Sequence, residues 1–111
     1  MGVKLTTLSA LAEPNRYQIV ELLREGPLTV GEIAERLGLQ QPQVSKHLRV
    51  LNESGLVEVQ PSANKRFYKL SPKPFLEMEE WITSFRSLWE DRFNRLDDYL
   101  RELQGKNGDS K

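Results

Sequence analysis

The hydrophobic pattern of this chain changes its period at Gly55. Before the glycine, apolar residues recur every three to four positions, which predicts a helix over 42–54 that ends at Gly55. After it, apolar and polar residues alternate in two runs, 56–60 and 66–70, as they do in half-buried strands. The residues between these runs are turn formers, so a β-hairpin is predicted, with its wing over 57–70. The inward face of the predicted helix consists of Val44, Leu48 and Leu51.

A second helix is predicted immediately before this one, over 29–37. Thr29 and Glu32 have the T-x-x-E spacing of a capping box, in which each side chain bonds the backbone N–H of the other residue. Gly38 follows, at the position where helices often end in the left-handed conformation. Two helices joined by so short a turn and followed by a hairpin predict a winged helix-turn-helix over 29–70.

The rest of the chain is predicted to be helical. Apolar spacing, and a proline at a first helical position, predict helices over 5–12 and 14–24. A long helix over 72–104 follows the hairpin, and the polar, glycine-containing tail 105–111 is expected to be flexible. The order α-α-α-α-β-β-α describes a mainly α fold with a small β-hairpin, in a single domain over 1–104.

A winged helix-turn-helix has a geometry suited to reading DNA. The second helix of the pair fits the major groove, the first helix braces it, and the hairpin can hold adjacent phosphates or the minor groove. Gln can pair with adenine, and Arg and Lys with guanine or phosphate. His47 stays open at this stage, because a lone histidine there is as often a packed surface residue as a DNA contact. The predicted DNA contacts are Gln41, Gln43, Ser45, Lys46, His47, Arg49, Lys65 and Arg66.

The net charge of zero conceals an uneven distribution along the chain. Residues 40–70 carry five basic and two acidic side chains, a net charge of +3, whereas residues 71–104 carry five basic and eight acidic ones, a net charge of −3. The positive block coincides with the predicted recognition helix and wing, as contact with phosphates would require. An ordinary solvated surface with chance clustering is the alternative, and the coincidence favours DNA binding.

Several segments resemble the ArsR/SmtB family of bacterial winged-helix repressors. They are L-A-E-P-N-R at 11–16, I-A-E-R-L-G-L at 33–39, Q-V-S-K-H-L-R-V-L at 43–51, G-L-V at 55–57 and R-F-Y-K-L at 66–70. The resemblance covers about residues 5–72. It implies a homodimeric repressor that binds a pseudo-palindromic operator. The residues that it places at the DNA are Gln43, Ser45, Lys46 and His47 in the groove and Arg66 in the wing.

The chain departs from the metal-sensing members of that family. One of their sites uses a cysteine pair at the start of the helix over 29–37, where this chain has Thr-Val-Gly. Their other common site uses histidines and carboxylates of the C-terminal helix, and no histidine lies between Pro72 and Leu103. Soft and borderline metals need such ligands. We therefore expect neither metal sensing nor a cofactor, and interpret the acidic residues of the long helix as a solvated face.

The long helix carries a nearly unbroken apolar seam in steps of three and four residues. A helix of about 31 residues is about 46 Å long, more than so small a domain needs to cover its own core. Since large exposed apolar patches usually mark interfaces, we predict a symmetric homodimer through this helix and the first one. The aromatic part of the seam could instead line a small-molecule pocket, although a dimer core is favoured. The predicted interface residues are Leu5, Leu8, Phe75, Met78, Ile82, Phe85, Trp89, Phe93, Leu96 and Leu100.

Composition and motifs exclude several other classes of protein. Without cysteine there is no disulfide framework and no cysteine nucleophile. An enzyme is not expected, because the sequence has no phosphate-binding glycine loop and its sole histidine lies on the recognition helix. No apolar run reaches the ~18–20 residues of a membrane span and no signal peptide is recognisable, so we expect a cytoplasmic protein without a membrane partner. The remaining alternative is a winged-helix protein–protein interaction module with only non-specific DNA affinity.

Overall fold

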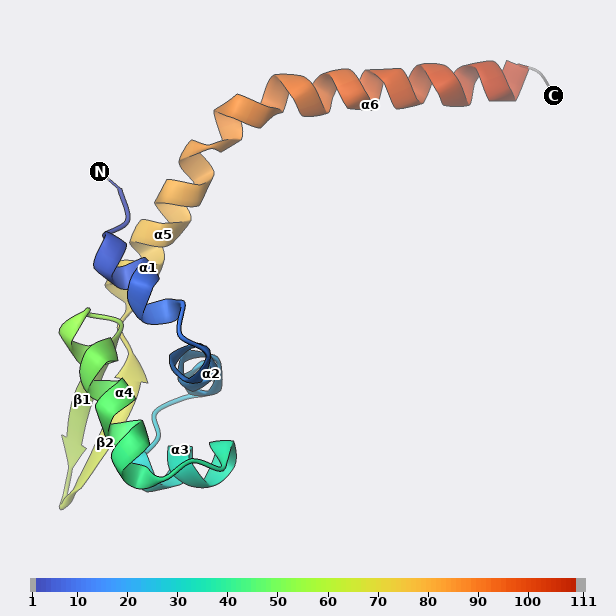
Figure 1. Cartoon of the computed structure of the whole chain (residues 1–111). Helices are drawn as coiled ribbons and strands as arrows, with labels where there is room; N and C mark the ends of the chain where they lie inside the picture. The colour runs from blue at the N-terminus through green and yellow to red at the C-terminus, as the bar shows by residue number, and fades with distance from the viewer. Residues whose placement is uncertain (1, 110–111) are drawn as a thin grey trace. The chain divides into compact units, whose positions relative to one another are not determined.

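The computed structural model describes the backbone of residues 2–109 and the side chains of residues 2–90, 92 and 94–105. Its contacts divide the chain into a head unit, Met1–Met78, and a C-terminal unit, Glu79–Lys111, each described here by itself. The order of elements is the predicted one, with the last helix in two pieces (Figure 1). The elements are α1 (Leu5–Leu11), α2 (Pro14–Leu23), α3 (Val30–Leu37), α4 (Gln41–Glu53), β1 (Val57–Ser62), β2 (Lys65–Leu70), α5 (Pro72–Ser84) and α6 (Arg86–Asp109).

The core of the head unit collects one apolar face from each of the helices α2, α3 and α4. The three residues predicted to face inward from α4 are at most 1% exposed, which confirms the predicted orientation of that helix. Ile19 of α2, Ile33 of α3 and Leu56 before β1 are fully buried beside them. Burying a side chain of this size contributes about 1.5–3 kcal/mol, so these contacts fix which face of α4 points away from the core.

The predicted capping box starts α3. The backbone N–H of Thr29 donates to Glu32 Oε1 at 3.0 Å, and the N–H of Glu32 donates to Thr29 Oγ1 at 3.2 Å. Gly38 ends the helix with φ at +66°, in the left-handed region that glycine adopts without steric cost. Both signals predicted from the sequence are therefore present, and they hold the turn of the helix-turn-helix to a few residues.

The helix α4, predicted to be the recognition helix, starts one residue earlier than predicted. Gln41 is its first residue, and the backbone N–H of the preceding Gln40 donates to Gln43 Oε1 at 3.1 Å. The prediction placed Pro42 first because proline lacks an N–H. The first turn of a helix tolerates proline at its second position for the same reason, since none of its first N–H groups has an intrahelical partner.

The hairpin is longer and its turn is tighter than predicted. The strands β1 and β2 pair in antiparallel fashion from Val57 opposite Leu70 to Ser62 opposite Lys65. Pro61 lies within β1, which is permitted because each strand of a two-stranded sheet is an edge. The connection is thus a two-residue turn in which Ala63 has a positive φ of 56°.

The long C-terminal helix is interrupted at Phe85, which corrects the prediction of one continuous helix over 72–104. The N–H of Phe85 donates to the carbonyl of Ile82, and that of Leu88 donates to the carbonyl of Phe85. These bonds span three residues instead of the four of a regular α-helix. In addition, Ser84 Oγ donates to the carbonyl of Trp81, a side-chain competition that bends helices.

The apolar spacing of the sequence changes next to this break. Apolar steps of three and four alternate along the predicted seam up to Phe85, but Phe85, Trp89 and Phe93 follow one another in two successive steps of four. Such a shift changes the heptad frame and locally unwinds a coiled-coil supercoil. The second helix, α6, continues to Asp109, beyond the predicted boundary at 104. The tail contains no proline, the residue that most strongly ends a helix.

Candidate nucleic-acid interface

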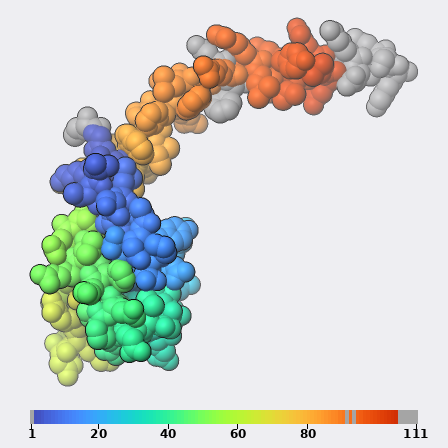
Figure 2. Space-filling view, viewed as in Figure 1, coloured from blue at the N-terminus to red at the C-terminus, as the bar shows by residue number. Residues whose placement is uncertain are grey.

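The face of α4 opposite the core presents basic side chains to solvent. Lys46 and Arg49 are exposed there, with Gln43 and Ser45 exposed on either flank. Figure 2 shows atoms of α3, α4 and the hairpin side by side on the visible face of the head unit. A helix that presents side chains of this kind, braced by a preceding helix, has the form that a major groove accepts.

Arg49 has an acidic neighbour one turn further along α4. Its Nε lies 3.3 Å from Glu53 Oε1, and the two side chains are 82% and 68% exposed. An ion pair so exposed contributes little free energy, typically 0–1 kcal/mol, so it competes weakly with a base or phosphate for the guanidinium. Glu53 was not among the predicted residues, although its i, i+4 spacing from Arg49 is a signal for such a pair.

The side chain of Gln43 bonds the backbone at the start of α4 and is also exposed to solvent. Its Oε1 accepts the hydrogen bond from the Gln40 backbone that opens α4. The amide nitrogen of the same side chain keeps its two donors for a base edge or a phosphate. Gln41, the other predicted glutamine contact, is exposed in the first turn.

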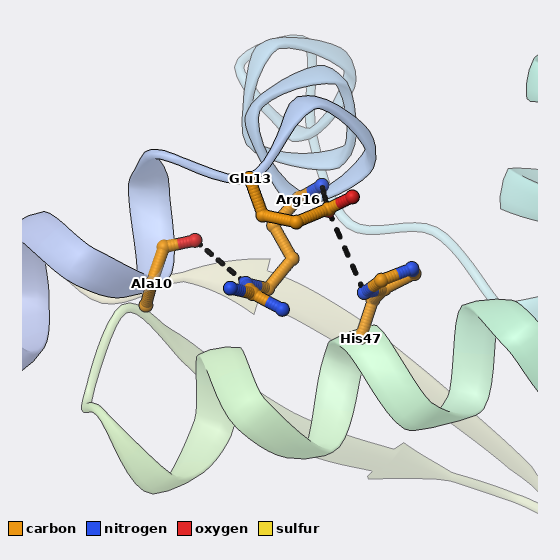
Figure 3. Close-up of polar contacts among 4 residues, drawn as sticks. All are labelled: Ala10, Glu13, Arg16 and His47. Carbon is orange, nitrogen blue, oxygen red and sulfur yellow. Dashed lines mark hydrogen bonds and ion pairs between the residues drawn. The ribbon is translucent and has the colours of Figure 1, made fainter.

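His47 faces away from the exposed basic residues. Its Nδ1 lies 3.7 Å from Glu13 Oε2, at the corner between α1 and α2 (Figure 3). The same carboxylate oxygen accepts the N–H of Arg16 at 2.8 Å, and Arg16 Nε donates to the carbonyl of Ala10 at 2.7 Å. The His47 side chain is only 20% exposed, so the structure places it among packed groups on the flank of α4.

The wing adds two more exposed basic residues to the head unit. Lys65 and Arg66 open β2 and are exposed. Together with Phe67 they line an open groove of about 570 Å³ whose other wall is the first turn of α3. Hydrogen bonds from Thr29 hold the pKa of Glu32, in that wall, below its ordinary value, and the charges of Arg36 and Lys65 lower it further. The carboxylate therefore stays charged beside the wing.

Comparisons with known proteins place this geometry in a family. Residues 13–59, from the α1–α2 corner to β1, match the family model described as bacterial regulatory proteins of the arsR family. A solved ArsR family transcriptional regulator is 30% identical, with a TM-score of 0.67 over 77% of this chain and 88% of that chain. This chain belongs to the ArsR family. Its winged helix-turn-helix is the fold of that family.

Of two further relatives of this ArsR-family chain, one is named as a repressor and the other as a homodimer. The biofilm growth-associated repressor of Xylella fastidiosa is 41% identical over 64 residues, which are 58% of this chain and 56% of the relative. A homodimeric winged helix-turn-helix DNA-binding domain from Mycobacterium bovis is 25% identical, with a TM-score of 0.61 over 72% of this chain and 77% of that one. The ArsR-family chain spans only 56–59% of the length of the curated relatives that it matches first.

The residues predicted for the dimer interface of this ArsR-family chain fall into two groups. Leu8, Phe75 and Met78 are half-buried, and the latter two pack partly against the head core. The side chain of Phe93 lies outside the described residues. The other members are 38–79% exposed: Leu5, Ile82, Phe85, Trp89, Leu96 and Leu100.

Metal sites and membrane-spanning helices need particular side chains or lengths, which can be compared with the described residues of the ArsR-family chain. Across the part of it that the structure describes, no group of three or more His, Cys, Asp or Glu side chains is arranged to hold a metal ion. No described helix combines the length and apolar character needed to cross a membrane.

Proposed function

We propose that this chain is a dimeric, sequence-specific DNA-binding transcriptional regulator that acts as a repressor. The observation that carries the proposal is the orientation of α4, whose buried face leaves Lys46 and Arg49 exposed to solvent. Lys65 and Arg66 of the wing are exposed as well. Such a surface suits bases in the major groove and phosphates on either side. Membership of the ArsR family supports the same role.

The apolar surface of the C-terminal unit supports dimerisation. Trp89, Leu96 and Leu100 of α6 are 44–53% exposed, and Ile82 of α5 is 64% exposed. An apolar row of this kind is covered by a partner in most proteins. We propose a second copy as that partner, in keeping with the homodimeric relative from Mycobacterium bovis. Two recognition helices related by a two-fold axis then suit half-sites about one helical turn, ~10 bp, or a multiple apart.

Repression, without thiolate or histidine metal sensing, is the further part of the proposal. The Xylella fastidiosa relative is named as a repressor, and this chain has neither cysteines nor a second histidine with which to bind a soft metal. A promoter overlapped by the bound site should therefore be transcribed less in the presence of the protein, in a purified transcription reaction. Increased transcription would identify an activator instead.

Selection of bound duplexes from a random pool tests the proposal most directly. We expect a palindromic consensus, bound about 10³-fold or more tightly than unrelated DNA, by a protein that sediments as a dimer. A protein that enriches no sequence and binds duplex DNA only weakly and in a salt-sensitive way would be a protein–protein interaction module with a winged-helix fold.

Single substitutions on α4 assign the surface. Lys46→Ala and Arg49→Ala should each weaken binding to the selected sequence by about 5-fold to 100-fold, because each removes a base or phosphate contact. Arg24→Ala, which removes an exposed arginine that pairs with Glu21 on α2, is the matched control and should bind normally. Unchanged affinity in both α4 variants would remove this helix from the DNA interface.

A further inference from the structure

We infer that His47 is a positioning residue that holds the recognition helix on the α1–α2 corner, and that it does not read a base. The inference rests on the proposed function, since it assigns a role within the DNA-binding head. It starts from the contact between His47 Nδ1 and Glu13 Oε2 at 3.7 Å. Figure 3 shows the imidazole of His47 turned toward Glu13 at the α1–α2 corner. Lys46 and Arg49 of the same helix are exposed, whereas His47 is half-buried.

The His47–Glu13 contact is the most sheltered contact between a carboxylate and a basic side chain among the described residues. Its side chains are 20% and 30% exposed, whereas the side chains of every other described pair are 41–82% exposed. Solvent and salt screen a sheltered pair less than an exposed one, so it has more influence on geometry. The same shelter leaves the imidazole little surface with which to meet a base edge.

Glu13 is itself fixed by the local fold. It is the N-cap residue of α2, where its carboxylate accepts the backbone N–H of Arg16. The guanidinium of Arg16 in turn donates to the carbonyl of Ala10, near the end of α1. His47 therefore meets a carboxylate that is bonded to the first turn of α2, and Arg16, which donates to that carboxylate, also bonds α1, so α4 contacts the α1–α2 corner at a fixed point.

The opposite flank of α4 has a corresponding tie. Asn52 Nδ2 donates to the carbonyl of Val57 at 3.1 Å, which joins the end of α4 to the first strand of the wing. Apolar contacts on the inward face fix which side of the helix is buried, and polar contacts on its flanks add restraints of their own to its rotation. The Asn52 hydrogen bond and the His47–Glu13 contact lie on opposite flanks of α4, so together they refine its rotation and hence the direction in which Lys46 and Arg49 project.

A double-mutant cycle tests this role. His47→Gln and Glu13→Gln keep polar side chains, and the glutamine at 13 retains an oxygen to cap α2. Each variant should weaken binding to the selected operator about 3-fold to 10-fold. The double variant should bind the operator about as tightly as the single variant with the lower affinity, because both changes break the same contact. The preferred base at every operator position should stay the same, in contrast to Arg49→Ala, which should relax the preference at one position.

Three outcomes would overturn the inference. A His47→Gln variant that alters the preferred base at one position of each half-site would make His47 a base reader. Single effects that add in the double variant would mean that the contact does not matter. If the unaltered protein selects no operator, the proposed function fails instead. The same double-mutant cycle is then measured on the free energy of unfolding. Losses of stability that add in the double variant would overturn the inference.

Discussion

The backbones of Leu28 and Tyr68 pair with each other in an antiparallel bridge. The N–H of Leu28 donates to the carbonyl of Tyr68 at 3.1 Å, and the N–H of Tyr68 donates to the carbonyl of Leu28 at 2.8 Å. Leu28 stands just before the cap of α3, and Tyr68 lies in β2. The wing is therefore attached by two backbone hydrogen bonds to the segment that leads into α3, the first helix of the helix-turn-helix.

Removal of both wing cations should flatten the salt dependence of DNA binding. Lys65→Ala combined with Arg66→Ala should reduce the slope of log affinity against log salt by about one unit for each lost phosphate contact. The base preference should persist, because α4 is unaltered. Both side chains are exposed, so folding should be unaffected. Lys73→Ala, an exposed lysine at the start of α5, is the control, and an unchanged slope in the double variant would take the wing out of the interface.

Loss of the α3 cap should destabilise the head. Thr29→Ala removes the hydroxyl that accepts the N–H of Glu32, and comparable caps are worth about 0.5–2 kcal/mol. Denaturant unfolding should show this loss, whereas Thr83→Ala, within α5 and exposed, should show none. Equal stability of the two variants would mean that α3 does not depend on its cap.

The stabilisation contributed by Glu32 should depend on pH in the acid range. Hydrogen bonds from Thr29 hold the folded-state pKa of this carboxyl below its ordinary value of 4.5. Its contribution is therefore complete at pH values above the unfolded-state pKa and is lost as the pH falls through the folded-state pKa. The difference in unfolding free energy between the unaltered protein and Glu32→Gln should be largest near neutral pH and should shrink toward pH 3. A difference that grows on acidification would contradict the direction of the shift.

A charge placed in the exposed apolar row of α6 should dissociate the dimer. Trp89→Asp would bury an unpaired carboxylate in the proposed interface, which should raise the dimer dissociation constant at least about 30-fold. Asn94→Asp introduces the same side chain at an exposed position on another side of α6 and should leave the dimer intact. Sedimentation over a range of protein concentrations distinguishes them, and an intact Trp89→Asp dimer would refute this interface.

The turn of the wing offers a stabilising substitution. Ala63 has a φ of +56°, where a side chain costs free energy that glycine does not pay. Ala63→Gly should therefore raise the unfolding free energy by about 0.5–1 kcal/mol, the steric relief outweighing the added freedom of the unfolded chain. Asn64→Gly, at the next residue, is the control and should not stabilise, because Asn64 does not have a positive φ. A loss of stability in Ala63→Gly would show that the turn is not strained.

The sequence predicted those features of the fold that depend on local patterns. The capping box at Thr29, the glycine that ends α3 and the buried face of α4 all follow from spacing or backbone preference within a few residues. Lys46 and Arg49 were placed on the exposed face for the same reason, since the opposite face was recognisable from its apolar period.

Features that depend on distant residues were not predictable in this way. The carboxylate of Glu13 and the imidazole of His47 are far apart in the sequence, so no periodicity could indicate that they meet. The backbone bridge from Leu28 to Tyr68 similarly uses groups that every residue possesses. The apolar steps shift next to Phe85, but the break itself is visible only in the altered hydrogen bonds around that residue.

The C-terminal unit has no buried side chain of its own among those described there. Helices of this kind are marginal in water unless an apolar face is covered. Residues 86–109 should therefore gain their order by mass action, and their melting temperature should rise with protein concentration. The core of the head unit, by contrast, is complete within one chain. Dilution should then melt residues 86–109 while the head unit stays folded. The concentration of the protein would itself set the fraction of molecules able to occupy both half-sites of an operator.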